Sequence, residues 1–206
     1  MKKIISIITV IIIPFISFSQ AIEQGNFEFS IGTGLGIYET TDNDTTNKNS
    51  TAVAGILNMS CQFAIANRLS IGIVFDRNGY AQEKDSLNKA HSLNALINAQ
   101  LRIVNALKTI IYLNLSGGYT NFKYIEGEHN LWVSGGGFII QPSIGFKHYF
   151  GKTVGFYIQS DYTTFNYKQL KDSENTVLKI GPANNLKDFQ LKLSGLNIRT
   201  GLTFKF

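Results

Sequence analysis

Apolar and polar residues alternate along most of this chain, and the alternation is clearest in its last stretch, from Leu196 to Phe206. In an extended strand, successive side chains point to opposite faces. One face of this strand carries Leu196, Ile198, Thr200, Leu202, Phe204 and Phe206, and the other carries Asn197, Arg199, Gly201, Thr203 and Lys205. The pattern predicts a strand that separates an apolar environment from a wet one, as the strands of a closed sheet in a bilayer must.

The same alternation recurs in seven earlier segments, so the sequence predicts an all-β fold of eight antiparallel strands. Polar stretches predict four long loops over residues 39–51, 77–90, 120–134 and 165–187. Three tight turns are expected around Asn67 and Arg68, at Asn105–Lys108 and at Tyr149–Lys152. Long and short connections therefore alternate, which is typical of up-and-down transmembrane β-barrels with long extracellular loops and short periplasmic turns.

A final alternating strand that ends in phenylalanine resembles the insertion signal of bacterial outer-membrane β-barrels, with Leu202, Phe204 and Phe206 as the signal residues. The chain length resembles that of the small eight-stranded OmpA/OmpX-type and porin-T-like barrels. The resemblance implies an integral protein of the cell outer membrane. Such a protein contacts outer-membrane lipid and is inserted by the barrel assembly machinery.

Residues 1–19 predict a cleaved signal peptide, because two lysines precede an apolar run and small residues, Ser17 and Ser19, stand at the minus-three and minus-one positions. An uncleaved membrane anchor is the alternative, but the run is short and contains Pro14. Residues 20–206 then form the barrel domain. Removing two of the 19 basic residues leaves 17 against 14 acidic ones, and this charge of +3 does not imply nucleic-acid binding.

Alternation alone does not decide whether the apolar face meets lipid or a dry interior, so a secreted lipocalin-like barrel is the competing architecture. Charges of both signs on the polar face favour a polar lumen, where they can pair. The predicted lumen network consists of Glu28, Asp76, Arg102, Lys147, Asp161, Arg199 and Lys205. Strand register predicts a salt bridge between Asp161 and Arg199, and it brings Glu28 to Lys205 at the seam between the first and last strands.

An eight-stranded barrel is just wide enough for its own side chains, so we expect a filled lumen without a diffusion pore. Tyr112 and Tyr157 are expected to pack against glycine positions inside it. Pro142 breaks the pattern of its strand, because proline is normally excluded from a paired central strand. It predicts a local bulge.

Some small outer-membrane barrels are lipid-modifying enzymes that use a Ser/His pair, but the histidines here are weak candidates. His91 and Ser92 are adjacent in a strand and point to opposite faces, so they cannot form a dyad with each other. His129 is expected in a loop and His148 at the periplasmic end, and no two histidines have metal-ligand spacing. The single cysteine, Cys61, cannot form an internal disulfide and falls on an apolar face. We expect no enzyme, cofactor or metal site.

The expected role is therefore structural or binding, with extracellular loops that contact a partner outside the cell or in the envelope. A narrow pore is one alternative, and an accessory subunit of an envelope secretion machinery, which the porin-T-like resemblance implies, is another. Candidate contact residues are Phe122, Tyr124 and Trp132 in the third loop, and Leu178, Ile180 and Leu186 in the fourth. The alternative is that these side chains pack the loops against one another.

Overall fold

The computed structural model describes residues 20–43, 50–81, 88–127, 131–181 and 186–206, so the predicted signal peptide lies outside the described residues. Strands form most of this part of the chain, and within it no helix is long and apolar enough to cross a membrane. The strands are β1 (Phe27–Asp42), β2 (Ser50–Ala66), β3 (Leu69–Tyr80), β4 (Lys89–Ala106), β5 (Thr109–Ile125), β6 (Trp132–Tyr149), β7 (Val154–Lys168), β8 (Lys179–Ile180), β9 (Lys187–Asp188) and β10 (Gln190–Lys205).

Eight of these strands close into a barrel in the order β1-β10-β7-β6-β5-β4-β3-β2, while β8 and β9 form a separate two-stranded sheet. Each barrel strand pairs antiparallel with its neighbours. The seam between β1 and β10 runs in one register from Glu28↔Lys205 to Asp42↔Leu191. Closure leaves no unpaired sheet edge, as a bilayer requires. The predicted eight-stranded up-and-down barrel is confirmed.

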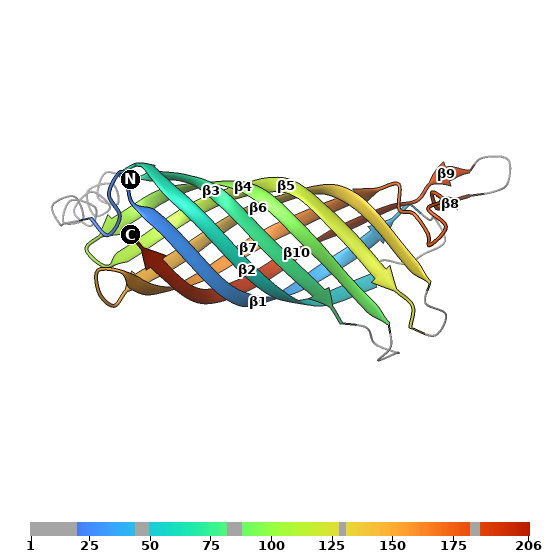
Figure 1. The fold of residues 1–206 in the computed structure, drawn as a ribbon, viewed down its shortest axis with the longest axis horizontal. Coiled ribbons are helices and arrows are strands. Elements are labelled where there is room, and N and C mark those ends of the chain that lie inside the picture. Colours follow the sequence, from blue (N-terminus) through green and yellow to red (C-terminus); the bar gives the residue numbers. More distant parts are fainter. Residues whose placement is uncertain (1–19, 44–49, 82–87, 128–130, 182–185) are drawn as a thin grey trace, which may run out of the picture.

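The two ends of the barrel differ in their connections. Residues 67–68, 107–108 and 150–153 make the three short turns, in agreement with the prediction. The connections at the other end include residues 169–189, which contain β8 and β9. Figure 1 shows that β1 begins and β10 ends at the end with the short turns, whereas β8 and β9 extend from the opposite end. We call these the periplasmic and extracellular ends, following the usual orientation of such barrels.

The strands continue further toward the extracellular end than the apolar alternation predicts. Residues 120–125 and 132–134 of the predicted loop over residues 120–134 belong to strands, because the β5–β6 pairing continues up to Ile125↔Trp132. Backbone hydrogen bonds do not depend on which side chains a strand carries, so pairing persists where both faces are polar. Several predicted strands were therefore too short at their extracellular ends.

Pro142 does not form the predicted bulge. The β6–β7 pairs are missing at Gln141 and Pro142, but the same register resumes from Ile140↔Thr164 to Ser143↔Asp161, so no extra residue is inserted. Because proline has no N–H to donate, the ladder is interrupted there and not shifted. Register shifts occur instead close to the periplasmic turns, between Ala64 and Ala66 and between Arg102 and Val104.

Candidate functional site

The apolar face of the barrel points outward. Ile97 is 73% exposed, Leu35 68% and Ile198 65%, whereas the lumen side chains of Glu28 and Arg102 are each 1% exposed. A water-soluble barrel would need the reverse arrangement, so the lipocalin-like alternative is wrong. Exposed aromatic side chains border the apolar belt, with Tyr119, Phe138 and Tyr162 toward the extracellular end and Phe63, Phe150 and Phe206 toward the periplasmic end.

A buried charge cluster fills the periplasmic part of the lumen around Glu28. Its carboxylate accepts hydrogen bonds from Lys147 Nζ at 2.9 Å and Tyr149 Oη at 2.7 Å, and Arg102 Nη2 lies 3.4 Å away. Arg102 also donates to Ser70 Oγ and to two backbone carbonyl oxygens near the β2–β3 turn. Two cations therefore share one carboxylate, and the cluster has a net charge of +1.

The predicted pairing of Glu28 with Lys205 is wrong, although the two residues are register neighbours across the seam. Lys205 Nζ donates to the carbonyl oxygen of Ala21 at 2.6 Å and lies 5.4 Å from the centre of the Tyr149 ring. Glu28 instead binds partners on β4 and β6, on other walls of the barrel. Across so narrow a lumen, these side chains reach Glu28 from other strands.

A second buried cluster surrounds Arg199 further along the lumen. Arg199 Nη1 donates to Asp76 Oδ2 at 2.8 Å, and Arg199 Nε lies 2.8 Å from Asp161 Oδ2, so the predicted pair with Asp161 is confirmed. The contact between Arg199 Nε and Asp161 Oδ2 is an ion pair, but its geometry is not that of a hydrogen bond. Asp161 accepts further bonds from Gln141 and Thr163. One cation and two carboxylates give this cluster a net charge of −1, which balances the first.

The space left between the two clusters is small. A cavity of about 20 Å³ lies between Lys147 and Arg199 and is lined almost entirely by polar side chains. This volume holds about one water molecule. Tyr112 and Tyr157 narrow the lumen at this level, and a Cβ added to Gly145 or Gly32 would overlap their rings. The predicted packing of these tyrosines against glycine positions is confirmed.

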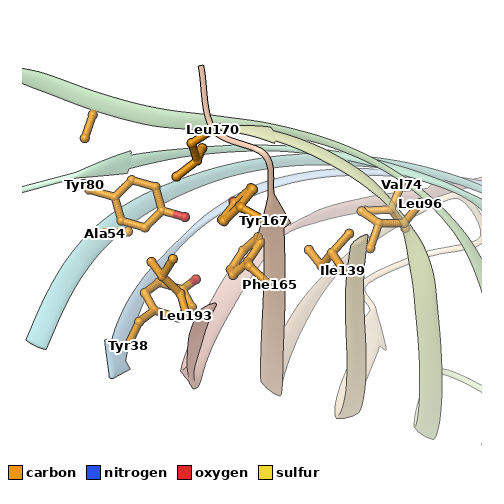
Figure 2. Close-up of a cluster of buried hydrophobic side chains, with 11 residues drawn as sticks. Tyr38, Ala54, Val74, Tyr80, Leu96, Ile139, Phe165, Tyr167, Leu170 and Leu193 are labelled. Atoms are coloured by element: carbon orange, nitrogen blue, oxygen red, sulfur yellow. The ribbon is translucent and has the colours of Figure 1, made fainter. Parts of the chain in front are cut away.

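Apolar side chains close the lumen toward the extracellular end. This extracellular plug consists of Tyr38, Ala54, Val74, Tyr80, Ala90, Leu96, Ile139, Phe165, Tyr167, Leu170 and Leu193. Figure 2 shows Tyr38, Tyr80, Phe165 and Tyr167 gathered inside the barrel. Leu170, which follows β7, is 1% exposed and joins them from the fourth loop. Sequence patterning missed this plug, because apolar residues on the polar face of a strand look like isolated exceptions.

The segment before β1 closes the periplasmic end. Ala21 and Ile22 are 1% and 0% exposed and pack in a cluster with Ala64, Ile110 and Tyr149. The backbone of Ile22 exchanges two hydrogen bonds with the Asn105 side chain, and Gln24 N donates to Asn67 Oδ1. We call residues 20–25 the N-terminal stopper. Sequence patterning could not predict this segment, because its only mark is two apolar residues in a short polar stretch.

Solved structures that match this arrangement of strands include outer-membrane proteins. Outer membrane protein AlkL matches with a TM-score of 0.58 and 12% sequence identity over 92% of this chain and 94% of AlkL. OprG from Pseudomonas aeruginosa matches with a TM-score of 0.54 and 11% identity over 89% of this chain and 97% of OprG. The fold is that of the small outer-membrane β-barrels. Neisserial surface protein A is a further match, with a TM-score of 0.50 and 12% identity over 85% of this chain and 98% of that protein.

No protein-family model matches the sequence, and no curated protein does. The resemblance to OmpA/OmpX-type barrels therefore holds at the level of the fold. Together with the apolar exterior, it makes the protein an integral outer-membrane barrel whose belt contacts lipid.

The three residues of the predicted insertion signal lie at the periplasmic end of β10 and just after it. Leu202 and Phe206 are 47% and 69% exposed on the lipid-facing side, and Phe204 packs near Phe29 with a ring separation of 6.3 Å. The backbone of Phe206 exchanges two hydrogen bonds with Phe27, which completes the seam. The predicted role of these residues in insertion stays a prediction.

The aromatic residues predicted for the third loop lie in strands of the barrel. Phe122 and Tyr124 belong to β5 and pack against the extracellular plug, with the Phe122 ring 5.4 Å from that of Tyr167. Trp132 begins β6, and Lys123 Nζ lies 5.4 Å from its ring centre. Phe122 and Tyr124 thus pack within the protein, which was the alternative to contact with a partner.

The fourth-loop candidates differ in their exposure. Leu178 packs against the extracellular plug, Ile180 is half-buried in β8, and Leu186 is 53% exposed. Leu178 therefore anchors the fourth loop to the extracellular plug, and Leu186, just before β9, is exposed to solvent.

The histidines lie far from one another along the barrel. His91 is near the extracellular end of β4, His148 is near the periplasmic end of β6 beside Thr109, and His129 lies outside the described residues. Among the described residues, no group of three His, Cys, Asp or Glu side chains is arranged to hold a metal ion. Cys61 is half-buried and unpaired with another cysteine.

Proposed function

We propose that this protein is a non-conducting outer-membrane barrel that acts at its extracellular end by binding a partner in the envelope or outside the cell. The observation that carries the proposal is the filled lumen, in which the cavity between Lys147 and Arg199 has a volume of about 20 Å³. A hydrated ion or small solute needs a continuous water-filled path, and side chains occupy that path at several levels.

The composition of the filling also supports a static lumen. The six buried charges of the two clusters sum to zero, and each lies within 3.4 Å of an opposite charge. Removing a partner from such a buried pair costs several kcal/mol. Opening a passage would break these pairs and also displace the extracellular plug, whose residues are at most 8% exposed.

Binding is assigned to the extracellular end because apolar side chains are exposed there beyond the lipid belt. Leu131 is 52% exposed just before β6, and Leu186 is 53% exposed between β8 and β9. Binding residues are often found on loops that a rigid scaffold holds in place. The proposed role is binding without catalysis, since His91 and His148 lie near opposite ends of the barrel.

Two measurements test the proposal. Purified protein in a planar bilayer should give no discrete conductance steps, and steps at every insertion would overturn the non-conducting assignment in favour of the narrow pore. A variant that lacks residues 20–25 and carries Arg102→Ser, Arg199→Ser, Tyr80→Ser and Tyr167→Ser is the matched positive control, because it removes the stopper and thins both clusters and the extracellular plug.

The binding assignment is tested by photo-crosslinking on intact cells. A photoreactive residue at position 186 should capture a discrete protein partner, whereas the same residue at the lipid-facing position 97 should not. Equal capture from both positions, or none from position 186, would overturn the binding role at the fourth loop. A closed barrel resists detergent until it is heated. A difference in gel mobility between unboiled and boiled samples of each variant therefore verifies that its barrel is folded.

A further inference from the structure

A hollow lies on the outer surface of the barrel where β5, β6 and β7 approach the extracellular end. Its volume is about 760 Å³. Three consecutive glycines of β6, residues 135–137, contribute no side chains to it, and the Tyr119 ring lies against Gly136. The wall nearest the lipid belt is formed by the register row of Tyr119, Phe138 and Asn166. The hollow is thus bounded by aromatic residues on the side that faces the membrane.

The opposite wall is basic. Lys168 and Lys171 line it together with Ser134 and Gln169, and no acidic residue is among the described residues that line the hollow. Within the described part of the chain, neither lysine forms an ion pair. Their charges are therefore available for an anionic group that enters the hollow.

The backbone at this place departs from the regular ladder. The β6–β7 register stops at Gly137↔Tyr167, and the next contact is the bridge Ser134↔Lys171. Between these pairs Gln169 adopts a φ of 55°, and Leu170 turns inward to the extracellular plug. The inward turn of Leu170 leaves Lys168 and Lys171 on either side of it at the rim of the hollow, so the basic wall is held by a buried anchor.

The level of the hollow points to its occupant. Tyr119 and Phe138 are 58% and 56% exposed and stand at the upper border of the apolar belt, where lipid headgroups begin. A lipid whose acyl chains lie along the belt would bring its headgroup phosphate level with the two lysines. We propose that this hollow binds the phosphate group of an anionic glycolipid of the outer leaflet, the lipid A part of lipopolysaccharide, with Lys168 and Lys171 as phosphate ligands.

Charge and shape both support this assignment. Lysine binds phosphate as a point charge, and a basic residue near an anionic lipid surface contributes about 1 kcal/mol. Losing both lysines should therefore weaken binding about twentyfold to thirtyfold. The aromatic wall adds contacts to the first part of the acyl chains, and the glycine floor makes room for a sugar ring.

The test is a native mass spectrometry titration of the purified full-length barrel in detergent. The probes are bis-phosphorylated lipid A, its dephosphorylated form, and phosphatidylglycerol. We expect one tight lipid A adduct, a much weaker one without the phosphates, and a loss of about twentyfold or more in Lys168→Gln/Lys171→Gln. Lys89→Gln/Lys179→Gln is the matched control, because it removes the same charge from exposed lysines outside the hollow.

Three results would overturn the proposal. Equal affinity of the two double variants would mean that general charge, and not the hollow, attracts the lipid. Equal binding of lipid A and its dephosphorylated form would remove the phosphate from the interaction. Phosphatidylglycerol binding as tightly as lipid A would remove the glycolipid assignment. None of these results bears on the lumen or on the protein partner, so this proposal and the proposed function fail separately.

Discussion

Glu28 is the residue on which the periplasmic charge cluster depends. Replacing it by glutamine keeps the side-chain size and an acceptor for Tyr149, but it leaves Lys147 and Arg102 buried without their counter-charge. The net charge of the cluster rises from +1 to +2. Breaking a buried pair by removing one partner costs about 3–5 kcal/mol, which is two to nearly four powers of ten in the folding equilibrium constant.

The assay is urea unfolding of the purified barrel in lipid vesicles, followed by the mobility of unboiled samples and by the fluorescence of Trp132, the single tryptophan. Glu28→Gln should lower the free energy of unfolding by about 3–5 kcal/mol. Glu23→Gln is the matched control, because Glu23 is exposed and its replacement should change stability by less than about 0.5 kcal/mol. Adding Lys147→Met to Glu28→Gln should recover part of the loss, since one unpaired cation is then gone.

Equal stability of Glu28→Gln and Glu23→Gln would refute the assigned role of Glu28. That result would mean that the two cations are solvated or paired elsewhere, and that the lumen at this level is wetter than the contacts of Glu28 indicate. An equal loss in the single and double variants would also contradict it, because the cost would then come from packing and not from charge.

Three further predictions concern packing and insertion. Gly145→Ala should destabilise the barrel by about 1–3 kcal/mol in the same urea assay, since its Cβ would overlap the Tyr112 ring, whereas Gly79→Ala, with nothing within 4 Å, should change stability little. Ile22→Ser should raise the rate of amide hydrogen exchange in residues 20–25 about thirtyfold without affecting the strands, because Ile22 is 0% exposed and anchors the stopper. An unchanged exchange rate would mean that the stopper is held by its hydrogen bonds. Phe206→Ala should reduce insertion in cells but leave refolding in detergent unchanged, because its side chain is 69% exposed while its seam bonds use the backbone; equal insertion in cells would argue against a signal for the assembly machinery.

Sequence patterning predicted the barrel because membrane insertion imposes a two-residue period on every strand. The same period placed Asp161 and Arg199 on the inner face, and counting from the short turns placed them at one level. The pair forms at 2.8 Å. Such predictions succeed when they depend on local alternation and on turns that fix the register.

The partners of Glu28 could not be found in this way. Its register neighbour is Lys205, yet it binds Lys147 and Arg102 from other strands of the wall. Register gives the neighbours within the sheet, but contacts across the lumen depend on the diameter and shear of the closed barrel. Neither the diameter nor the shear can be inferred from the alternation within a single strand.

The sequence by itself thus determined the number of barrel strands, the division of each strand into an apolar and a polar face, and the position of the closing seam. Only the tertiary structure decided which charges pair, how Phe122 and Leu170 join the extracellular plug, and how Ile22 enters the periplasmic mouth. The physical reason is the distance over which each pattern carries information. Alternation and turns relate only residues that are near in the chain or paired in the sheet. The filling of the lumen depends on side chains that meet only after the sheet has closed.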